Sequence, residues 1–256
     1  EGWAAGIRLI QRIAANARYF TDAASKIPID VALGDAAAGM SIDFYGRTQS
    51  EAVRVADGSS RMEYLTPVGG SSVGVDPIGL LRGAPSPGVA RAFMEFVMSI
   101  DGQKLWNFRP GTPGGPERFA LRRLPIRKEL YDPSYREFVS DPEVRPYEEA
   151  AKFDYRAAWT APLFRTVSFA VRVMCLDPHD ELRSAWSALV EAGMPAEALA
   201  EFERIEGIEY DAAATTIREL LRSGDKLAEV RLARALGDGF RARYRRAERL
   251  AKESAR

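Results

Sequence analysis

The stretch that decides the predicted fold covers residues 38–46 and reads Ala38-Gly39-Met40-Ser41-Ile42-Asp43-Phe44-Tyr45-Gly46. Its apolar side chains Met40, Ile42 and Phe44 stand at every second position. Residues two apart share one face of a strand, so the alternation predicts a strand over this stretch. The opposite face would then carry Ser41, Asp43 and Tyr45.

These three polar side chains form the first candidate binding site. A carboxylate such as Asp43 is a hard oxygen ligand, suited to a metal cation or an ammonium group. Tyr45 offers a hydroxyl, or a phenolate beside a strongly Lewis-acidic metal. Spacing alone leaves an alternative open, in which Asp43 pairs with a nearby arginine and Tyr45 only caps the strand.

A second candidate lies just upstream, where Thr21, Asp22 and Ser25 precede a short helix opened by Pro28. Hydroxyls and free backbone N–H groups at a helix start can hold an anion. Ordinary helix capping explains the same residue types equally well. The Gly69-Gly70-Ser71-Ser72 loop has no lysine and no helix start after it, so it is interpreted as a plain turn.

The neighbouring patterns predict helices and strands in alternation. A helix is expected over 3–17, a short one from Pro28 to Gly34, and strands over 61–66 and 71–81. Ser86-Pro87 should open another helix, whose buried stripe is Val89, Phe93, Phe96 and Val97. From Asp132 onward the signals are helical. We therefore expect an α/β region over 1–131 and a helical region over 132–256.

Composition bounds the class of protein. The 256 residues include 36 Lys+Arg and 36 Asp+Glu with 46% hydrophobic residues, which favours a folded chain over a disordered one and argues against a nucleic-acid binder. The longest uncharged run, Tyr64 to Val75, has 12 residues, whereas a membrane span needs about 20. The chain opens Glu1-Gly2-Trp3, without a secretory signal or an initiating Met, so we expect a processed or excised piece.

Several catalytic signatures are missing from the sequence. It has no G-x-x-x-x-G-K-[ST] loop, no G-x-S-x-G elbow and no C-x-x-C pair. The single histidine, His179, stands at a predicted helix start, and the single cysteine, Cys175, stands in an apolar run typical of a core. The basic end, Arg231 to Arg256, is interpreted as a solvated helix face, with docking onto a partner as the alternative.

Three segments resemble one known family. The run 30–46, the segment Asp76-Pro77-Ile78-Gly79-Leu80-Leu81-Arg82-Gly83-Ala84-Pro85, and the segment 90–106 are similar to the solute-binding proteins of ABC transporters. The nearest group is the ferric-iron-binding type, and the likeness extends over about Trp3 to Arg127. That group carries adjacent tyrosines on the cleft strand, whereas this chain has Phe44 followed by Tyr45.

The resemblance implies a partial type II periplasmic-binding-protein-like α/β fold, followed by the helical C-terminal region and lacking the N-terminal lobe. It implies a monomer, periplasmic or extracellular, that captures a metal ion, a metal chelate or a small organic molecule and delivers it to a membrane permease. No cofactor is expected beyond a bound metal ion as ligand. Ser41, Asp43, Tyr45, Thr21 and Ser25 would contact the solute, with Tyr45 and Asp43 as the metal ligands.

Two other functions compete with solute binding. An enzyme could use the same fold, since fold does not determine function, but only Asp43, Asp22 or Tyr45 could act as base or nucleophile. A protein-interaction module is the second alternative, in which the helices after Asp132 and their basic end dock onto a permease or another protein.

Overall fold

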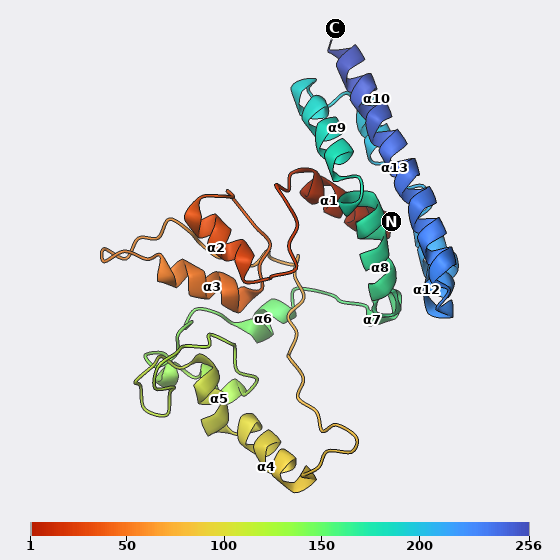
Figure 1. Ribbon diagram of the computed structural model, residues 1–256. Helices are drawn as coiled ribbons and strands as arrows, with labels where there is room; N and C mark the ends of the chain where they lie inside the picture. Colours follow the sequence, from red (N-terminus) through yellow and green to blue (C-terminus); the bar gives the residue numbers. More distant parts are fainter. Residues whose placement is uncertain (1, 256) are drawn as a thin grey trace. The chain divides into compact units, whose positions relative to one another are not determined.

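The computed structural model describes residues 2–255 and divides the chain into two compact units. Unit 1 combines the N-terminal segment up to Phe20 with the residues from Arg156 onward, and unit 2 is Thr21–Tyr155. Figure 1 traces both units along the chain. The boundary expected at residues 131 and 132 therefore falls inside unit 2.

The predicted α/β fold is wrong. Helices hold 58% of the chain, strand only 2%, and the described residues contain no sheet. The only ladder contacts among residues 2–255 are two isolated antiparallel bridges, Arg54 to Ser60 and Phe108 to Val139. Without a sheet, this chain does not have the type II periplasmic binding fold.

Unit 1 is a helical bundle around one apolar core. Its elements are α1 (Gly2–Ala15), α7 (Ala157–Thr160), η3 (Ala161–Leu163), α8 (Phe164–Val171), η4 (Arg172–Leu176), α9 (His179–Glu191), α10 (Ala196–Phe202), α11 (Tyr210–Ala212), η5 (Ala213–Ile217), α12 (Arg218–Ser223) and α13 (Lys226–Ser254). The largest buried apolar side chains include Met174, Leu182, Leu189, Phe202 and Phe240. Burying each such side chain contributes about 1.5–3 kcal/mol.

The long helix α13 organises unit 1. Its buried residues recur every three or four positions and therefore form one stripe: Ala233, Gly237, Phe240, Tyr244, Ala247 and Ala251. This stripe packs against α9 and α10, which run beside α13 in Figure 1. Asp225 caps the first turn by accepting a hydrogen bond of 2.9 Å from the Ala228 N–H.

A buried polar chain crosses the core of unit 1. The Gln11 side-chain amide donates to the Tyr244 hydroxyl at 3.0 Å and to the Phe202 carbonyl at 2.8 Å. The Tyr244 hydroxyl in turn donates to the Met174 carbonyl at 2.9 Å. Burial raises the pKa of Tyr244 far above its ordinary value, so the phenol stays protonated and acts as this donor.

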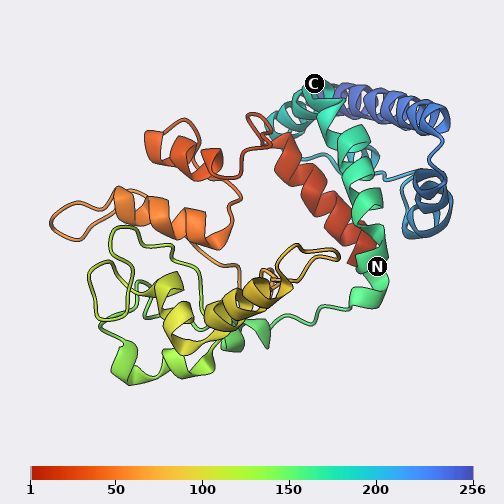
Figure 2. The same cartoon turned by 60° about the horizontal axis from the view of Figure 1, so that its bottom comes forward.

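Unit 2 has little apolar core. Its elements are α2 (Lys26–Leu33), α3 (Asp43–Ala52), α4 (Pro87–Met98), α5 (Ile100–Asn107), η1 (Lys128–Tyr131), η2 (Pro133–Tyr135) and α6 (Pro146–Ala150). Its buried apolar cluster consists of Phe108, Leu130 and Val139. Helices α2 and α3 lie side by side in both views (Figures 1 and 2). Polar contacts must therefore supply much of the cohesion of this unit.

The strand predicted at 38–46 is a helix start instead. Ile42 is extended, and α3 begins at Asp43, so the alternation of apolar side chains spans only the approach to the helix. In a helix, successive side chains turn by about 100°. Asp43 and Tyr45 are therefore separated by about 200° and do not share a face, as they would on a strand.

The strands predicted at 61–66 and 71–81 do not form either. The turn between them exists, because the Gly70 N–H donates to the Pro67 carbonyl at 3.1 Å, but no backbone hydrogen bond joins the two segments in the part of the chain that the structure describes. The stripe predicted to be buried on α4 is also wrong: no α4 residue is buried, and Val89, Phe93 and Phe96 are exposed.

Several predicted helices are confirmed. The helix expected over 3–17 is α1, and the helix expected from Pro87 is α4. The short helix near Pro28 is α2, which begins at Lys26 and ends where Gly34 adopts the left-handed conformation at φ 85°. Each of these carries a terminus signal or a 3.6-residue period over at least two turns.

None of the helices among residues 2–255 combines the length and apolar composition that a bilayer-spanning helix needs.

Replacing Tyr244 with Phe tests the buried polar chain. The variant leaves the Gln11 amide and the Met174 carbonyl without their shared partner, so unfolding in urea should cost about 1–3 kcal/mol less. Tyr210→Phe is the matched control, because its hydroxyl donates to the Trp159 carbonyl at 3.3 Å from a 40% exposed side chain. Unfolding is followed by circular dichroism. If both variants lose the same free energy of unfolding, the buried hydrogen bonds of Tyr244 do not stabilise unit 1.

Candidate functional site

Arg47 lies at the centre of a polar cluster in unit 2. Its position four residues after Asp43 places both side chains on one face of α3. One Arg47 amino group (Nη2) donates to Asp43 Oδ2 at 2.7 Å and to the Arg122 backbone carbonyl at 2.8 Å. The Arg47 side chain is 9% exposed, so this guanidinium is held almost entirely by protein groups.

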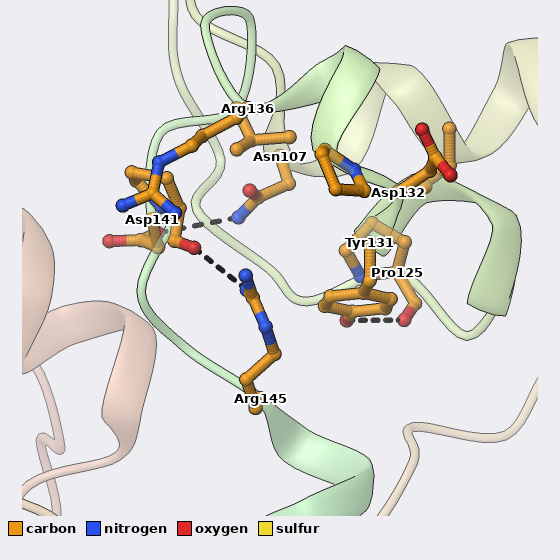
Figure 3. A pocket seen from close by; sticks show the side chains of 11 residues that line it. Asn107, Pro125, Tyr131, Asp132, Arg136, Asp141 and Arg145 are labelled. Atoms are coloured by element: carbon orange, nitrogen blue, oxygen red, sulfur yellow. Dashed lines mark hydrogen bonds between the residues drawn. The ribbon is translucent and has the colours of Figure 1, made fainter.

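Asp141 joins Arg47 to two further segments. Its Oδ2 atom lies 3.4 Å from Arg47 Nε, a contact of opposite charges whose N–H is not aligned for a hydrogen bond. The Asn107 amide, at the end of α5, donates to the same oxygen at 3.3 Å, as Figure 3 shows. The other carboxylate oxygen accepts a hydrogen bond from Arg122 Nη2. We call Asp43, Arg47, Asn107, Arg122 and Asp141 the Arg47 cluster.

Arg122 adopts a backbone conformation that side chains rarely tolerate. Its φ of 54° lies in the left-handed region. A residue held this way persists only where its surroundings determine it, and such residues concentrate at functional sites. Here Arg47 fixes the Arg122 carbonyl, and Asp141 fixes the Arg122 guanidinium.

Two members of the cluster, Arg47 and Arg122, line a pocket with a volume of about 350 Å³. Small-ligand sites usually measure about 300–1,000 Å³. We call this cavity the Ser50 pocket; it is lined by Arg47, Ser50, Glu51, Arg54, Ser60, Met62, Glu63, Tyr64 and Arg122. Three of these residues, Arg47, Ser50 and Glu51, come from one face of α3, because they are three and four positions apart.

Ser50 brings an unused hydroxyl into this lining. The residue is 9% exposed, and its Oγ atom is buried without a hydrogen-bond partner. A buried hydroxyl left unpaired costs about 1–3 kcal/mol. Arg122 Nε is likewise buried without a hydrogen-bond partner.

Tyr64 lies against α3 because Gly46 has no side chain. A Cβ at position 46 would come within 2.3 Å of the Tyr64 ring. The ring centroid is 6.0 Å from the Arg47 guanidinium carbon, a separation at which cation–π attraction is significant. Gly46 therefore allows the tyrosine to line the pocket beside Arg47.

Asp141 itself lines a second cavity. Its volume is about 40 Å³, enough for a water-sized ligand, and Asn107, Tyr131, Arg136 and Arg145 are among the residues that line it (Figure 3). The Tyr131 hydroxyl donates to the Pro125 carbonyl at 2.7 Å, and burial raises the pKa of Tyr131 well above its ordinary value. This cavity is too small for an organic solute.

The structure separates most of the side chains that the sequence proposed as a site. Asp43 is the exception that enters the Arg47 cluster, by pairing with Arg47. Tyr45 packs its ring against Phe44 at 4.4 Å between centroids, and the Ser41 hydroxyl donates to the Ile42 carbonyl at 3.0 Å.

The two hydroxyl residues proposed before α2 do not line the Ser50 pocket. Thr21 accepts a hydrogen bond from the Ala23 N–H at 3.1 Å. Ser25 occupies the position before α2, with no hydrogen bond from its side chain to the helix. Thr21 thus serves its own local turn, and Ser25 does not cap α2 through its side chain.

Sequence reasoning missed Ser50, Tyr64, Arg122 and Asp141. The spacing of Arg47, Ser50, Glu51 and Arg54 was the available signal, since it repeats at three and four residues. No local pattern links α3 to Arg122 or Asp141, which reach it only through the tertiary fold. In the described part of the chain, no three His, Cys, Asp or Glu side chains gather in an arrangement that could hold a metal ion.

Cys175 and His179 belong to the packing of unit 1. Cys175 is fully buried in the core, as predicted, and burial raises the pKa of its thiol to about 12. His179 is the first residue of α9, and its Nε2 lies 3.3 Å from the Ala14 carbonyl.

Comparison with known proteins gives no match: no family model, no curated protein and no solved structure is significantly similar to this chain.

Replacing Asp141 with Asn tests the Arg47 cluster. Two guanidinium groups would lose their shared counter-charge, and removing one partner of a buried ion pair typically costs about 3–5 kcal/mol. Hydrogen exchange of the backbone amides in α3 and α5 should therefore accelerate strongly.

The matched control is Glu143→Gln. Glu143 pairs with Arg136 at the surface, where the two side chains are 75% and 56% exposed, so its loss should cost no more than about 1 kcal/mol. Similar exchange rates in both variants would show that the buried cluster does not stabilise unit 2.

Proposed function

We propose that this chain binds a small polar organic solute in the Ser50 pocket and serves as the solute-binding component of an ABC import system. The observation that carries the binding proposal is Ser50, which lines a cavity of about 350 Å³ and whose buried hydroxyl has no hydrogen-bond partner within the protein. A folded chain gains stability when such a group finds a partner, and a bound solute supplies one.

The pocket favours an organic solute over a metal ion. Its lining has two carboxylates, Glu51 and Glu63, but no group of three His, Cys, Asp or Glu side chains suited to a metal exists among the described residues, and its guanidinium groups cannot ligate a cation. The two residues expected to hold a metal are engaged elsewhere, since Asp43 pairs with Arg47 and Tyr45 packs on Phe44. The proposal therefore assigns the organic member of the expected solute classes.

The import role rests on the resemblance of residues 30–46, 76–85 and 90–106 to ABC solute-binding proteins. It places the chain in the periplasm or outside the cell, as a monomer that delivers its solute to a permease. A two-lobed cleft is not part of the proposal, because binding takes place within unit 2. Binding without chemistry suffices for this role.

Ligand-observed NMR against defined probe classes tests the binding proposal. The probes are amino acids, dicarboxylates and polyols at millimolar concentration. At least one class should bind, and Ser50→Ala should weaken it about tenfold, which corresponds to about 1.4 kcal/mol for one hydrogen bond.

Thr48→Ala is the matched control, since Thr48 lies on the same helix and is exposed. It should leave the affinity unchanged. If no probe binds, or if Ser50→Ala and wild type bind equally well, the Ser50 pocket is not the binding site.

A further inference from the structure

We infer that the exposed face of α1 binds a second copy of this chain, through antiparallel pairing of the two α1 helices. This inference goes beyond the proposed function, since the Ser50 pocket belongs to unit 2 and α1 belongs to unit 1. It replaces the monomer that the resemblance implies with a weak dimer.

Helix α1 is apolar on two opposite faces. One face packs into unit 1, where Ile7, Ala14 and Ala15 are buried. On the other face Leu9 and Ile13 are 59% and 42% exposed. A surface helix normally turns polar residues to solvent, whereas a helix that is apolar all round is normally buried. The exposed face of α1 therefore suits a protein partner.

This exposed face combines two large residues with two glycines. Gly2, Gly6, Leu9 and Ile13 stand four, three and four positions apart, which places them on one side of the helix. A Cβ at either glycine would have no other atom within 4 Å, so open space lies beside both. The first half of the face is therefore hollow, and the second half protrudes.

The face is complementary to itself in antiparallel orientation. The pairs Gly6 with Leu9 and Gly2 with Ile13 are centred on the same point, between positions 7 and 8. One antiparallel register therefore sets each large side chain of one copy opposite a glycine of the other, and two-fold symmetry repeats both contacts. A parallel pair would instead set leucine against leucine and glycine against glycine.

The charges of α1 are compatible with this contact. Arg8 and Arg12 lie on the flank of the helix, where Glu203 engages both. Arg8 Nε donates to the Glu203 carbonyl at 3.2 Å, and Arg12 Nε donates to the Glu203 carboxylate at 2.6 Å. The exposed face itself carries no charged residue, as is typical of the centre of a protein interface. A second uncharged helix therefore fits it better than an acidic or basic partner does.

The contact is small, because α1 has only 14 residues. A pair of such helices buries less than the roughly 1,200–2,000 Å² of a standard stable interface. We therefore expect a weak dimer, with a dissociation constant on the order of 100 μM.

Sedimentation equilibrium of the full chain, from about 10 μM to about 1 mM, tests the inference. The average mass should rise from 28.3 kDa toward twice that value. Leu9→Ala should weaken the dimer about tenfold, because it removes a protruding side chain. Gly6→Leu should weaken it by at least as much, because it fills the gap that receives Leu9 of the other copy.

Gly6→Leu also distinguishes a fitted contact from general hydrophobic association. The substitution adds apolar surface and favours the helix, since glycine is a poor helix former, so non-specific association should increase. The double variant Gly6→Leu with Leu9→Ala exchanges the large and the small position. It should therefore dimerise within about threefold of wild type, although each single variant is weaker.

Leu33→Ala is the matched control. Leu33 is the last residue of α2 and is 70% exposed, so its loss removes a similar apolar surface outside α1 and should leave the dimer unchanged.

Three results would overturn the inference. The first is a wild type that stays monomeric up to about 1 mM, which would give the face a different occupant. The second is a Gly6→Leu variant that dimerises as well as wild type. The third is a double variant that does not recover dimerisation, because the two copies would then not pair in this register. None of the three bears on solute binding, which is measured at the pocket in unit 2.

Discussion

The ion pair between Arg47 and Asp141 is the contact on which unit 2 depends. Among the described residues, the buried apolar cluster of this unit consists of Phe108, Leu130 and Val139, so hydrophobic burial alone supplies little cohesion. The side chains of Arg47 and Asp141 are 9% and 4% exposed, and they join α3 to the segment that follows α5. A pair this buried adds little stability over apolar packing, but losing one partner leaves an uncompensated charge inside the protein. The pair therefore specifies the arrangement of unit 2.

The same contact shapes the proposed binding site. Arg47 holds the Arg122 carbonyl while Asp141 holds the Arg122 guanidinium, which keeps that residue in the left-handed conformation at φ 54°. With their charges already satisfied, these arginines form a rigid polar wall and not a free anion site. The other residues that line the pocket with them include Ser50, Glu63 and Tyr64.

Local signals in the sequence were sufficient for the helices and insufficient for the site. Long 3.6-residue periods and clear terminus signals predicted α1 and α4 correctly, and Gly34 marked the end of α2. The alternation at Met40, Ile42 and Phe44 led to a wrong strand prediction. Three alternating apolar residues are too few to distinguish a strand from the extended segment before a helix. The possible pairing of Asp43 with an arginine was visible in the sequence. That arginine is Arg47, and its other partners, Arg122 and Asp141, come from distant segments of the chain. A local periodicity in a single sequence does not encode such long-range contacts.

The most direct test of this account is a double-mutant cycle on Arg47 and Asp141, with Arg47→Met, Asp141→Asn and the double variant compared with wild type. The free energy of unfolding is obtained from hydrogen exchange of the α3 amides. If the pair holds unit 2 together, the two single losses should overlap, with a coupling of more than about 2 kcal/mol. Losses that add to within about 0.5 kcal/mol would show that the two side chains do not depend on each other, and the account would be wrong.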